Sequence, residues 1–161
     1  FVGYDIEETL RGTDITATGT TGDYTGQLVI AGSSVESLTL TVDLTTLQSD
    51  ESRRDDAIRH DGLETDSFPN ATFTMVEPVQ LSATPSIDEE IEVEVTGDLT
   101  LHGVTRAVTV ATKARWNGET IDISGDIPIT LADYDITPPS RDFVSVRDEG
   151  TIVFVVQLSR G

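Results

Sequence analysis

The chain of 161 residues contains no cysteine, so disulfide bonds and thiolate chemistry are excluded. Basic residues are also scarce, because 10 lysines and arginines stand against 29 aspartates and glutamates, a formal net charge of −19. Such a chain lacks the basic footprint that binds nucleic acid and the polybasic segments that dock on anionic membranes. We therefore expect no nucleic-acid partner. The charge is typical of a self-repelling, solubilising surface, and the alternatives are salt adaptation or a cationic partner.

Long apolar segments are missing too. No apolar run approaches the length of a transmembrane helix, and no signal peptide is visible. The chain begins at Phe1, inside a segment that already has the pattern of a strand. We therefore expect that a leader or an anchor segment precedes this sequence in the natural protein.

Recognisable catalytic motifs are absent as well. His60 and His102 are the only histidines, and neither belongs to a metal-binding repeat or a nucleophile motif. We expect His60 to favour the dipole at the end of a short helix. For His102 we expect a backbone hydrogen bond in a turn, with a ligand contact as the alternative. Glu8 is the one carboxylate whose position in the strand alternation places it on an inner face, and the sequence shows no evident partner for it. We expect no catalysis, no metal and no cofactor.

Apolar and polar residues alternate along most of the chain. The pattern is clear over residues 91–101, 121–131 and 152–158, and such alternation indicates half-buried strands. Asn117-Gly118 is a strong hairpin signal, and His102-Gly103 joins two more strand-like runs. We count about eight strands, whose short connections require antiparallel pairing.

The predicted strands are unusually long. Several extend over roughly 10 to 13 residues against a usual 5 to 6, which gives a length on the order of 35 Å. Long strands with one apolar face must hide that face, either in a sandwich or by closing into a barrel. We predict an all-β fold, a single domain over residues 1–161 that forms an extended eight-stranded antiparallel barrel. Such a barrel is filled by side chains or holds one small ligand.

Two segments interrupt the alternation. Residues 49–59 have serine and acidic residues at their start and Gly62 beyond their end, which predicts one short capped helix. In that helix, Arg54 either attaches the helix to the barrel wall or faces an anionic head group. Residues 133–143 contain Pro138-Pro139 and predict an ordered loop with one helical turn.

Acidic residues cluster in and after the predicted helix. Calcium takes several oxygen ligands, but the spacing here does not match the twelve-residue calcium loop and three arginines are interleaved. We therefore expect a solvated, ion-paired helix face. The acidic residues concerned are Asp55, Asp56, Asp61, Glu64 and Asp66.

Three stretches together resemble the YceI-like family, the polyisoprenoid-binding, lipocalin-like proteins of bacteria. The segment Gly97-Asp98-Leu99-Thr100-Leu101-His102-Gly103-Val104-Thr105 is the most specific. The other two are the helix with its exit and the loop that contains two prolines. Their residues are Arg54-Asp55, Leu63, Phe68-Pro69 and Ala71-Thr72-Phe73, then Asp133-Tyr134, Pro139-Ser140 and Phe143. The chain looks most like acidic members from actinobacteria.

The resemblance implies an extended eight-stranded lipocalin-like barrel with the helix near its mouth and an apolar channel inside. It also implies a non-enzymatic binder of a long-chain isoprenoid or related amphiphilic lipid, of the polyprenyl phosphate or quinone type. Members of this family are exported, so we expect an extracellular, periplasmic or lipoprotein-anchored location at the cell envelope. A homodimer is compatible with this interpretation.

The residues expected to contact the ligand are the large apolar ones on inward strand faces, in the helix exit and in the proline loop. In a barrel, core and binding pocket lie on the same face, so core packing is the alternative role for each of them. Arg54 and His102 are the head-group candidates. The expected lining is Tyr4, Ile6, Leu40, Val42, Phe68, Phe73, Met75, Leu99, Leu101, Val108, Val110, Trp116, Ile123, Ile127, Ile129, Tyr134, Phe143, Phe154 and Val156.

Two other classes of function stay open at this stage. The first is a structural or protein-interaction barrel at the cell surface whose core is filled by its own side chains. The second is an enzyme acting on a bound lipid, which would need two titratable groups converging inside the barrel. The interior volume distinguishes a binder from a filled barrel. A second titratable group next to Glu8 inside the barrel is what an enzyme would require.

Overall fold

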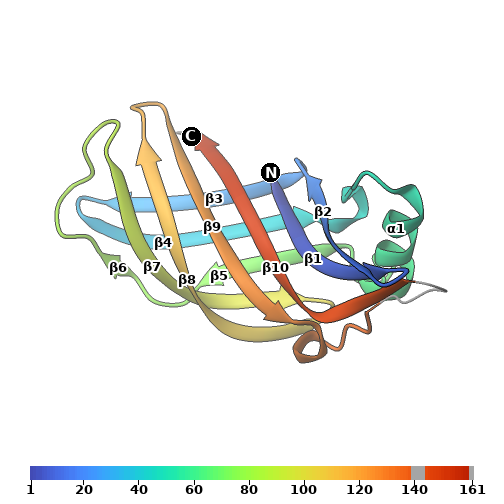
Figure 1. Ribbon diagram of the computed structural model, residues 1–161. Coiled ribbons are helices and arrows are strands. Elements are labelled where there is room, and N and C mark those ends of the chain that lie inside the picture. The colour runs from blue at the N-terminus through green and yellow to red at the C-terminus, as the bar shows by residue number, and fades with distance from the viewer. Residues whose placement is uncertain (139–143, 160–161) are drawn as a thin grey trace.

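The computed structural model describes residues 1–138 and 144–159, which form one curved antiparallel sheet (Figure 1). Its strand order is β2-β1-β10-β9-β8-β7-β5-β4-β3, and the short β6 pairs with β4. The strands are β1 (Val2–Leu10), β2 (Thr13–Thr21), β3 (Tyr24–Ala31), β4 (Ser34–Asp43), β5 (Asn70–Met75), β6 (Val79–Gln80), β7 (Glu90–Leu101), β8 (Val104–Trp116), β9 (Thr120–Thr130) and β10 (Val144–Ser159).

The predicted turn between β7 and β8 is confirmed. The two strands pair without interruption from Glu90 opposite Arg115 to Leu101 opposite Val104. His102 and Gly103 form the two-residue connection, with φ angles of 54° and 74°. Positive φ at both positions matches the right-handed twist of the flanking strands, and glycine adopts it without steric cost.

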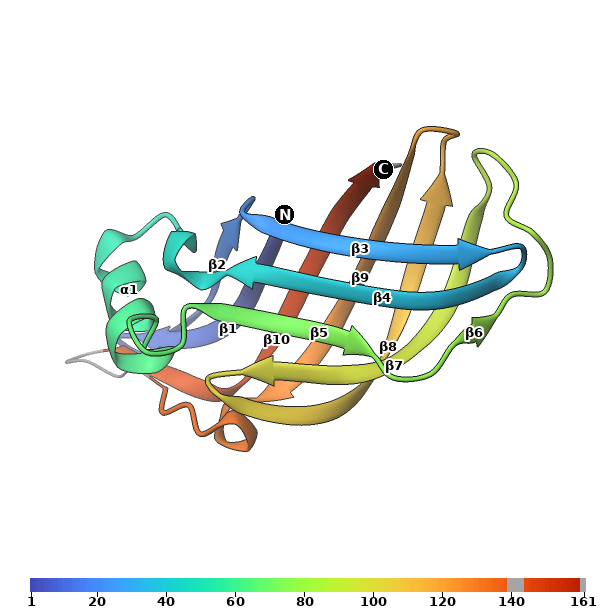
Figure 2. The same cartoon turned by 180° about the vertical axis from the view of Figure 1, so that it is seen from behind.

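The sheet curls around its apolar face into a barrel-like shape (Figures 1 and 2). Among the described residues no ladder joins β2 to β3, which are the two ends of the strand order. Near that seam β3 reaches β10, because the backbone N–H of Gln157 donates to the hydroxyl oxygen of Tyr24 at 2.9 Å. The all-β antiparallel fold with one short helix is therefore confirmed, and the sheet remains unclosed at this seam.

The structure contains more strands than the eight that the alternation indicates. The strand β2 has only Ile15 and Ala17 as apolar residues, and β6 is two residues long. Small and polar residues give little alternation signal. The inner face of β2 nevertheless packs well, because Ala17 is only 2% exposed.

Three aromatic rings on the inner face lie over glycines of the neighbouring strand. A Cβ atom at Gly97 would lie 2.5 Å from Cζ of Phe73 and 2.6 Å from the carbonyl oxygen of Thr74. The glycine therefore makes room for the ring and shapes the interior. The three pairs are Tyr4 over Gly19, Phe73 over Gly97, and Phe154 over Gly125.

The predicted helix lies at one end of the barrel (Figure 1). It consists of α1 (Ser52–Ala57), which continues into a π-helical turn, η2 (Ile58–Gly62). The side chain of Glu51 caps the start by accepting a hydrogen bond from the Arg53 backbone. Two short 3₁₀ turns, η1 (Leu44–Thr46) and η3 (Leu131–Tyr134), complete the described helical elements. The turn η3 overlaps only the start of the loop predicted over residues 133–143, of which residues 139–143 lie outside the described ranges.

An ion pair attaches α1 to the barrel wall. The Nε atom of Arg54 donates to Glu8 on β1 at 2.8 Å, and a second nitrogen donates to the same carboxylate. Arg54 also donates to Asp50 at 2.7 Å. The side chains of Arg54 and Glu8 are only 12% and 7% exposed. Arg54 therefore performs the wall-attaching role that the sequence left open, and Glu8 has the partner that sequence reasoning missed.

We expect Gly97→Ala to lower the free energy of unfolding by about 1–3 kcal/mol, the usual cost of overpacking, because Phe73 and the backbone at Thr74 must move. Gly22→Ala is the matched control, since a Cβ there meets no atom within 4 Å. Equilibrium urea denaturation measures both variants. Equal stability of Gly97→Ala and the wild type would contradict the packing described for Phe73.

We expect Arg54→Met to destabilise the fold by about 3 kcal/mol, because it leaves the Glu8 carboxylate buried without its partner. The double variant Glu8→Leu with Arg54→Met removes both charges and should regain most of that loss. Denaturation of the two single variants and the double variant gives the coupling free energy. If the single losses simply add, the ion pair does not couple the helix to the wall.

Candidate functional site

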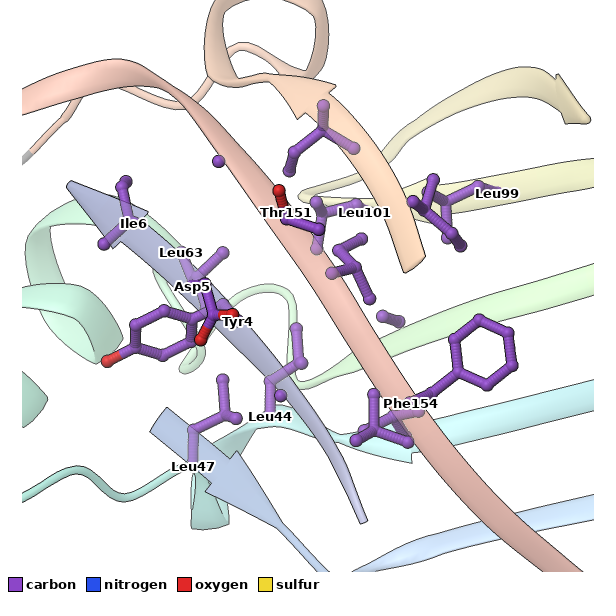
Figure 3. Close-up of a pocket in the computed structure, with 18 of the residues that line it drawn as sticks. Tyr4, Asp5, Ile6, Leu44, Leu47, Leu63, Leu99, Leu101, Thr151 and Phe154 are labelled. Atoms are coloured by element: carbon purple, nitrogen blue, oxygen red, sulfur yellow. The ribbon is translucent and has the colours of Figure 1, made fainter. Parts of the chain in front are cut away.

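An apolar cavity of about 180 Å³ lies inside the barrel at the end that α1 covers. Residues of β1, β4, β5, β7, β8, β9 and β10 line it, together with residues of α1, η2 and η3. Figure 3 shows Leu44, Leu47 and Leu63 lying on the same cavity as Leu101 and Phe154. The arrangement offers shape and apolar contact, the two properties that a site for a thin apolar ligand needs.

Most of the expected lining residues border this cavity. They come from strands far apart in the sequence, and the curled sheet brings them together. Arg54, one of the two head-group candidates, also borders the cavity. The expected residues that line it are Tyr4, Ile6, Leu40, Val42, Phe73, Leu99, Leu101, Val110, Ile123, Ile127, Ile129 and Phe154.

The remaining expected residues are placed elsewhere. Met75 and Val156 are buried in the hydrophobic core, and Val156 is fully buried. Trp116 ends β8, where its carbonyl accepts a hydrogen bond from Asp88. Val108 and Tyr134 border a second, polar cavity instead.

Phe68 and Phe143 complete this group. The ring of Phe68 packs edge-on against His102, with centroids 4.7 Å apart, and not against the cavity. Phe143 lies outside the described residues.

Several lining residues were missed because they lie outside strands. Leu47 follows η1, Leu63 follows η2, and Ile136 follows η3. Period-two alternation cannot indicate residues on turns and short helices. The available signal was chemical, since large aliphatic residues in polar, irregular segments tend to be anchored in a core.

The Glu8–Arg54 pair is a charged group at the edge of the cavity. Both residues border the cavity, and their hydrogen-bonding capacity is directed at each other and at Asp50. Burial lowers the pKa of Arg54, but the hydrogen bonds to Glu8 and Asp50 outweigh burial, so the pKa is raised overall. Arg54 is thus a charged group that two carboxylates already neutralise.

Tyr4 carries its ring from β1 into the same region (Figure 3). Burial, followed by the negative charge of Asp55, raises the pKa of Tyr4 to about 12. Asp55 is itself buried and accepts hydrogen bonds from both the backbone N–H and the hydroxyl of Ser49. The tyrosine hydroxyl at this end of the cavity therefore remains neutral at physiological pH.

His102, the other head-group candidate, is 8% exposed and does not border the cavity. Its Nδ1 lies 2.9 Å from the carbonyl oxygen of Tyr134, and its Nε2 lies 2.8 Å from Glu64. Both ring nitrogens therefore have a hydrogen-bond partner within the fold. His102 makes the predicted backbone hydrogen bond and ties together the β7–β8 turn, η3 and the segment after η2.

The acidic cluster is divided between buried and exposed positions. Asp55 is buried, whereas Asp56, Asp61 and Asp66 are exposed, so the expected solvated face describes only part of the cluster. His60 is exposed, 3.9 Å from Asp66. In the described ranges no group of three or more histidine and acidic side chains could hold a metal ion. No helix in those ranges is long and apolar enough to cross a membrane.

Curated relatives match parts of the chain. The UPF0312 protein VPA0850 of Vibrio parahaemolyticus is 36% identical over 103 residues, which cover 59% of this chain and 50% of that protein. Protein YceI of Escherichia coli O157:H7 is 29% identical over 127 residues, covering 73% of this chain and 62% of that protein. The matched part therefore spans about half to three fifths of these relatives.

Solved structures with a similar fold match nearly the whole chain. A polyisoprenoid binding domain from Saccharophagus degradans has a TM-score of 0.79 at 19% identity, covering 99% of this chain and 94% of that one. BcnA of Burkholderia cenocepacia has a TM-score of 0.72 at 20% identity, covering 97% and 96%. A family model described as YceI-like domain matches residues 2–158. The chain therefore belongs to the YceI-like domain family.

Proposed function

We propose that this protein binds and carries a long-chain isoprenoid or a related amphiphilic lipid, with the chain in the apolar cavity, and catalyses no reaction. The observation that carries the proposal is the cavity itself, enclosed by Leu, Ile, Val and Phe side chains from around the barrel. The structural similarity to a domain described as polyisoprenoid binding supports the same ligand class.

The cavity provides a driving force for binding. At about 24 cal/mol per Å³, an unfilled cavity of this size costs about 4 kcal/mol relative to a filled one. A ligand that fills the cavity recovers part of that cost and removes its own apolar surface from water, which contributes about 25 cal/mol per Å² before ordering costs. A branched hydrocarbon chain has the width and chemistry for this space.

The cavity volume limits how much of a ligand fits at once. A dry apolar cavity of about 150 Å³ is enough to bind benzene, so 180 Å³ accommodates an isoprene unit or two. Beyond the cavity the barrel is filled by buried side chains such as Met75 and Val156. A longer chain would bind with these side chains displaced or with the sheet opened at the β2–β3 seam. The filled part also favours the alternative, a structural or protein-interaction barrel.

The Glu8–Arg54 pair supports binding over catalysis. General acid–base chemistry needs a carboxyl group that can exchange a proton with a substrate. Glu8 accepts hydrogen bonds from two nitrogens of Arg54 and is only 6% exposed. Such a carboxylate is engaged by Arg54 and positions the helix.

We also propose that the domain functions outside the cytoplasm, at the cell envelope. The absence of cysteine and the acidic composition are compatible with that location. Fractionation of cells that express the full-length protein would test it, and recovery only in the cytoplasmic fraction would contradict the location.

We expect the purified wild-type protein to bind isoprenoid chains and to release lipid on extraction with organic solvent, detected by mass spectrometry. Ala71→Leu adds bulk inside the cavity and should weaken isoprenoid binding by about tenfold or more, equivalent to about 1.4 kcal/mol. Ala111→Leu is the matched control, because Ala111 is exposed and does not border the cavity.

Circular dichroism would first establish that both variants fold. Wild-type protein that neither yields lipid nor binds isoprenoids would contradict the proposal and favour the filled structural barrel. Equal affinity of the Ala71→Leu variant and the wild type would place any bound lipid outside this cavity.

A further inference from the structure

The barrel wall splits between β8 and β9. The two strands pair only from Thr112 opposite Gly125 to Trp116 opposite Ile121. Along residues 104–111, β8 pairs with β7 alone, and along residues 126–130, β9 pairs with β10 alone. Pro128 lies in the part of β9 that does not pair with β8, and it has no N–H to donate to such a ladder. In Figure 1 the two strands are adjacent near their connecting turn and separate farther along.

A polar cavity of about 550 Å³ opens at this split and extends from β8, β9 and η3 across β10 to β1 and β2. It shares five lining residues with the apolar cavity, so the two cavities adjoin each other across the wall. One of the shared residues is Gly150, which has no side chain to thicken the wall there. An apolar cavity next to a polar one matches the two parts of an amphiphile, which are an apolar chain and a polar head group.

The charges around the polar cavity do not favour an anion. Its lining includes two guanidinium groups and four carboxylates. Arg147 lies 2.7 Å from Glu7 and 3.6 Å from Asp14. Arg106 donates to the carbonyl oxygen of Asp133 at 3.0 Å, with the carboxylate of the same residue 3.8 Å away. Both cations are therefore paired already, and carboxylates are in excess.

The expected head-group residues offer no better site. Arg54 is paired with Glu8 and Asp50, and both ring nitrogens of His102 are occupied by Glu64 and Tyr134. A phosphate at Arg54 would also have to displace a buried carboxylate. The polar cavity, in contrast, adjoins the apolar cavity and offers a head group open polar space.

We infer that the head group of the bound amphiphile lies in the polar cavity that opens at the split between β8 and β9, and that this site selects an uncharged, hydrogen-bonding head over a phosphate. The inference rests on the proposed function. Threonine hydroxyls of Thr16, Thr130 and Thr151 line this cavity and can donate to and accept from such a head. The excess of carboxylates repels a phosphate, and because these side chains are partly exposed the repulsion is strongest at low ionic strength.

Three ligands with the same isoprenoid chain test the inference: the alcohol, its monophosphate and the hydrocarbon without a head. Their affinities for the wild-type protein are measured by fluorescence competition. We expect the alcohol to bind about tenfold or more tightly than the monophosphate. Binding of the hydrocarbon reports on the apolar cavity alone, so the absence of binding by all three ligands would overturn the proposed function. Hydrocarbon binding with a monophosphate as tight as the alcohol would overturn only the head-group site.

Two variants locate the head group. Glu149→Lys reverses a charge in the polar cavity and should improve monophosphate binding relative to alcohol by about tenfold. Glu36→Lys is its matched control, because Glu36 is exposed on β4 and lines neither cavity. In this variant the ratio of monophosphate affinity to alcohol affinity should stay at the wild-type value. Equal shifts in both variants would show a general charge effect and overturn the site.

A second comparison does not depend on charge. Ala107→Trp fills the polar cavity from its exposed rim and should weaken alcohol binding by about tenfold while hydrocarbon binding stays unchanged. Ala111→Trp, four residues farther on the same strand and outside the cavity, should leave both affinities unchanged. Unchanged alcohol binding in the Ala107→Trp variant would place the head group elsewhere.

Discussion

The structure depends on one constraint, that long strands with a single apolar face must remove that face from water. Twelve residues of β7 and thirteen of β8 carry this pattern, and neither strand can hide it as part of a flat sheet. Curling the sheet brings inward residues from distant strands together around one axis. The apolar cavity lies inside that curl, lined by inward residues of strands far apart in the sequence.

The end of the barrel near α1 is organised by polar contacts, and these contacts restrict what the cavity can bind. Arg54 attaches the helix to β1 through Glu8, and His102 joins the β7–β8 turn to η3 and to Glu64. The polar groups of Arg54 and His102 are therefore engaged in contacts within the fold. The resulting container has an apolar interior with few unpaired charges, and that property favours a carrier of neutral lipid over an enzyme.

Much of the fold could be predicted from the sequence, because period-two alternation and turn chemistry are local signals. His102-Gly103 as a turn, residues 49–59 as a helix and most of the inward strand residues follow from them. The lining by Leu47 and Leu63 could not be predicted, since no period applies to turns. The partner of Glu8 lies 46 residues away in the helix, and the split between β8 and β9 depends on register. Neither leaves a local pattern in the sequence.

A crystal structure of the protein with a bound isoprenoid alcohol tests the central claim most directly. The account predicts continuous density for a chain between Tyr4, Phe73 and Phe154, with its hydroxyl end directed toward the split between β8 and β9. A barrel whose cavity stays empty while the lipid lies on its outer surface would contradict the account.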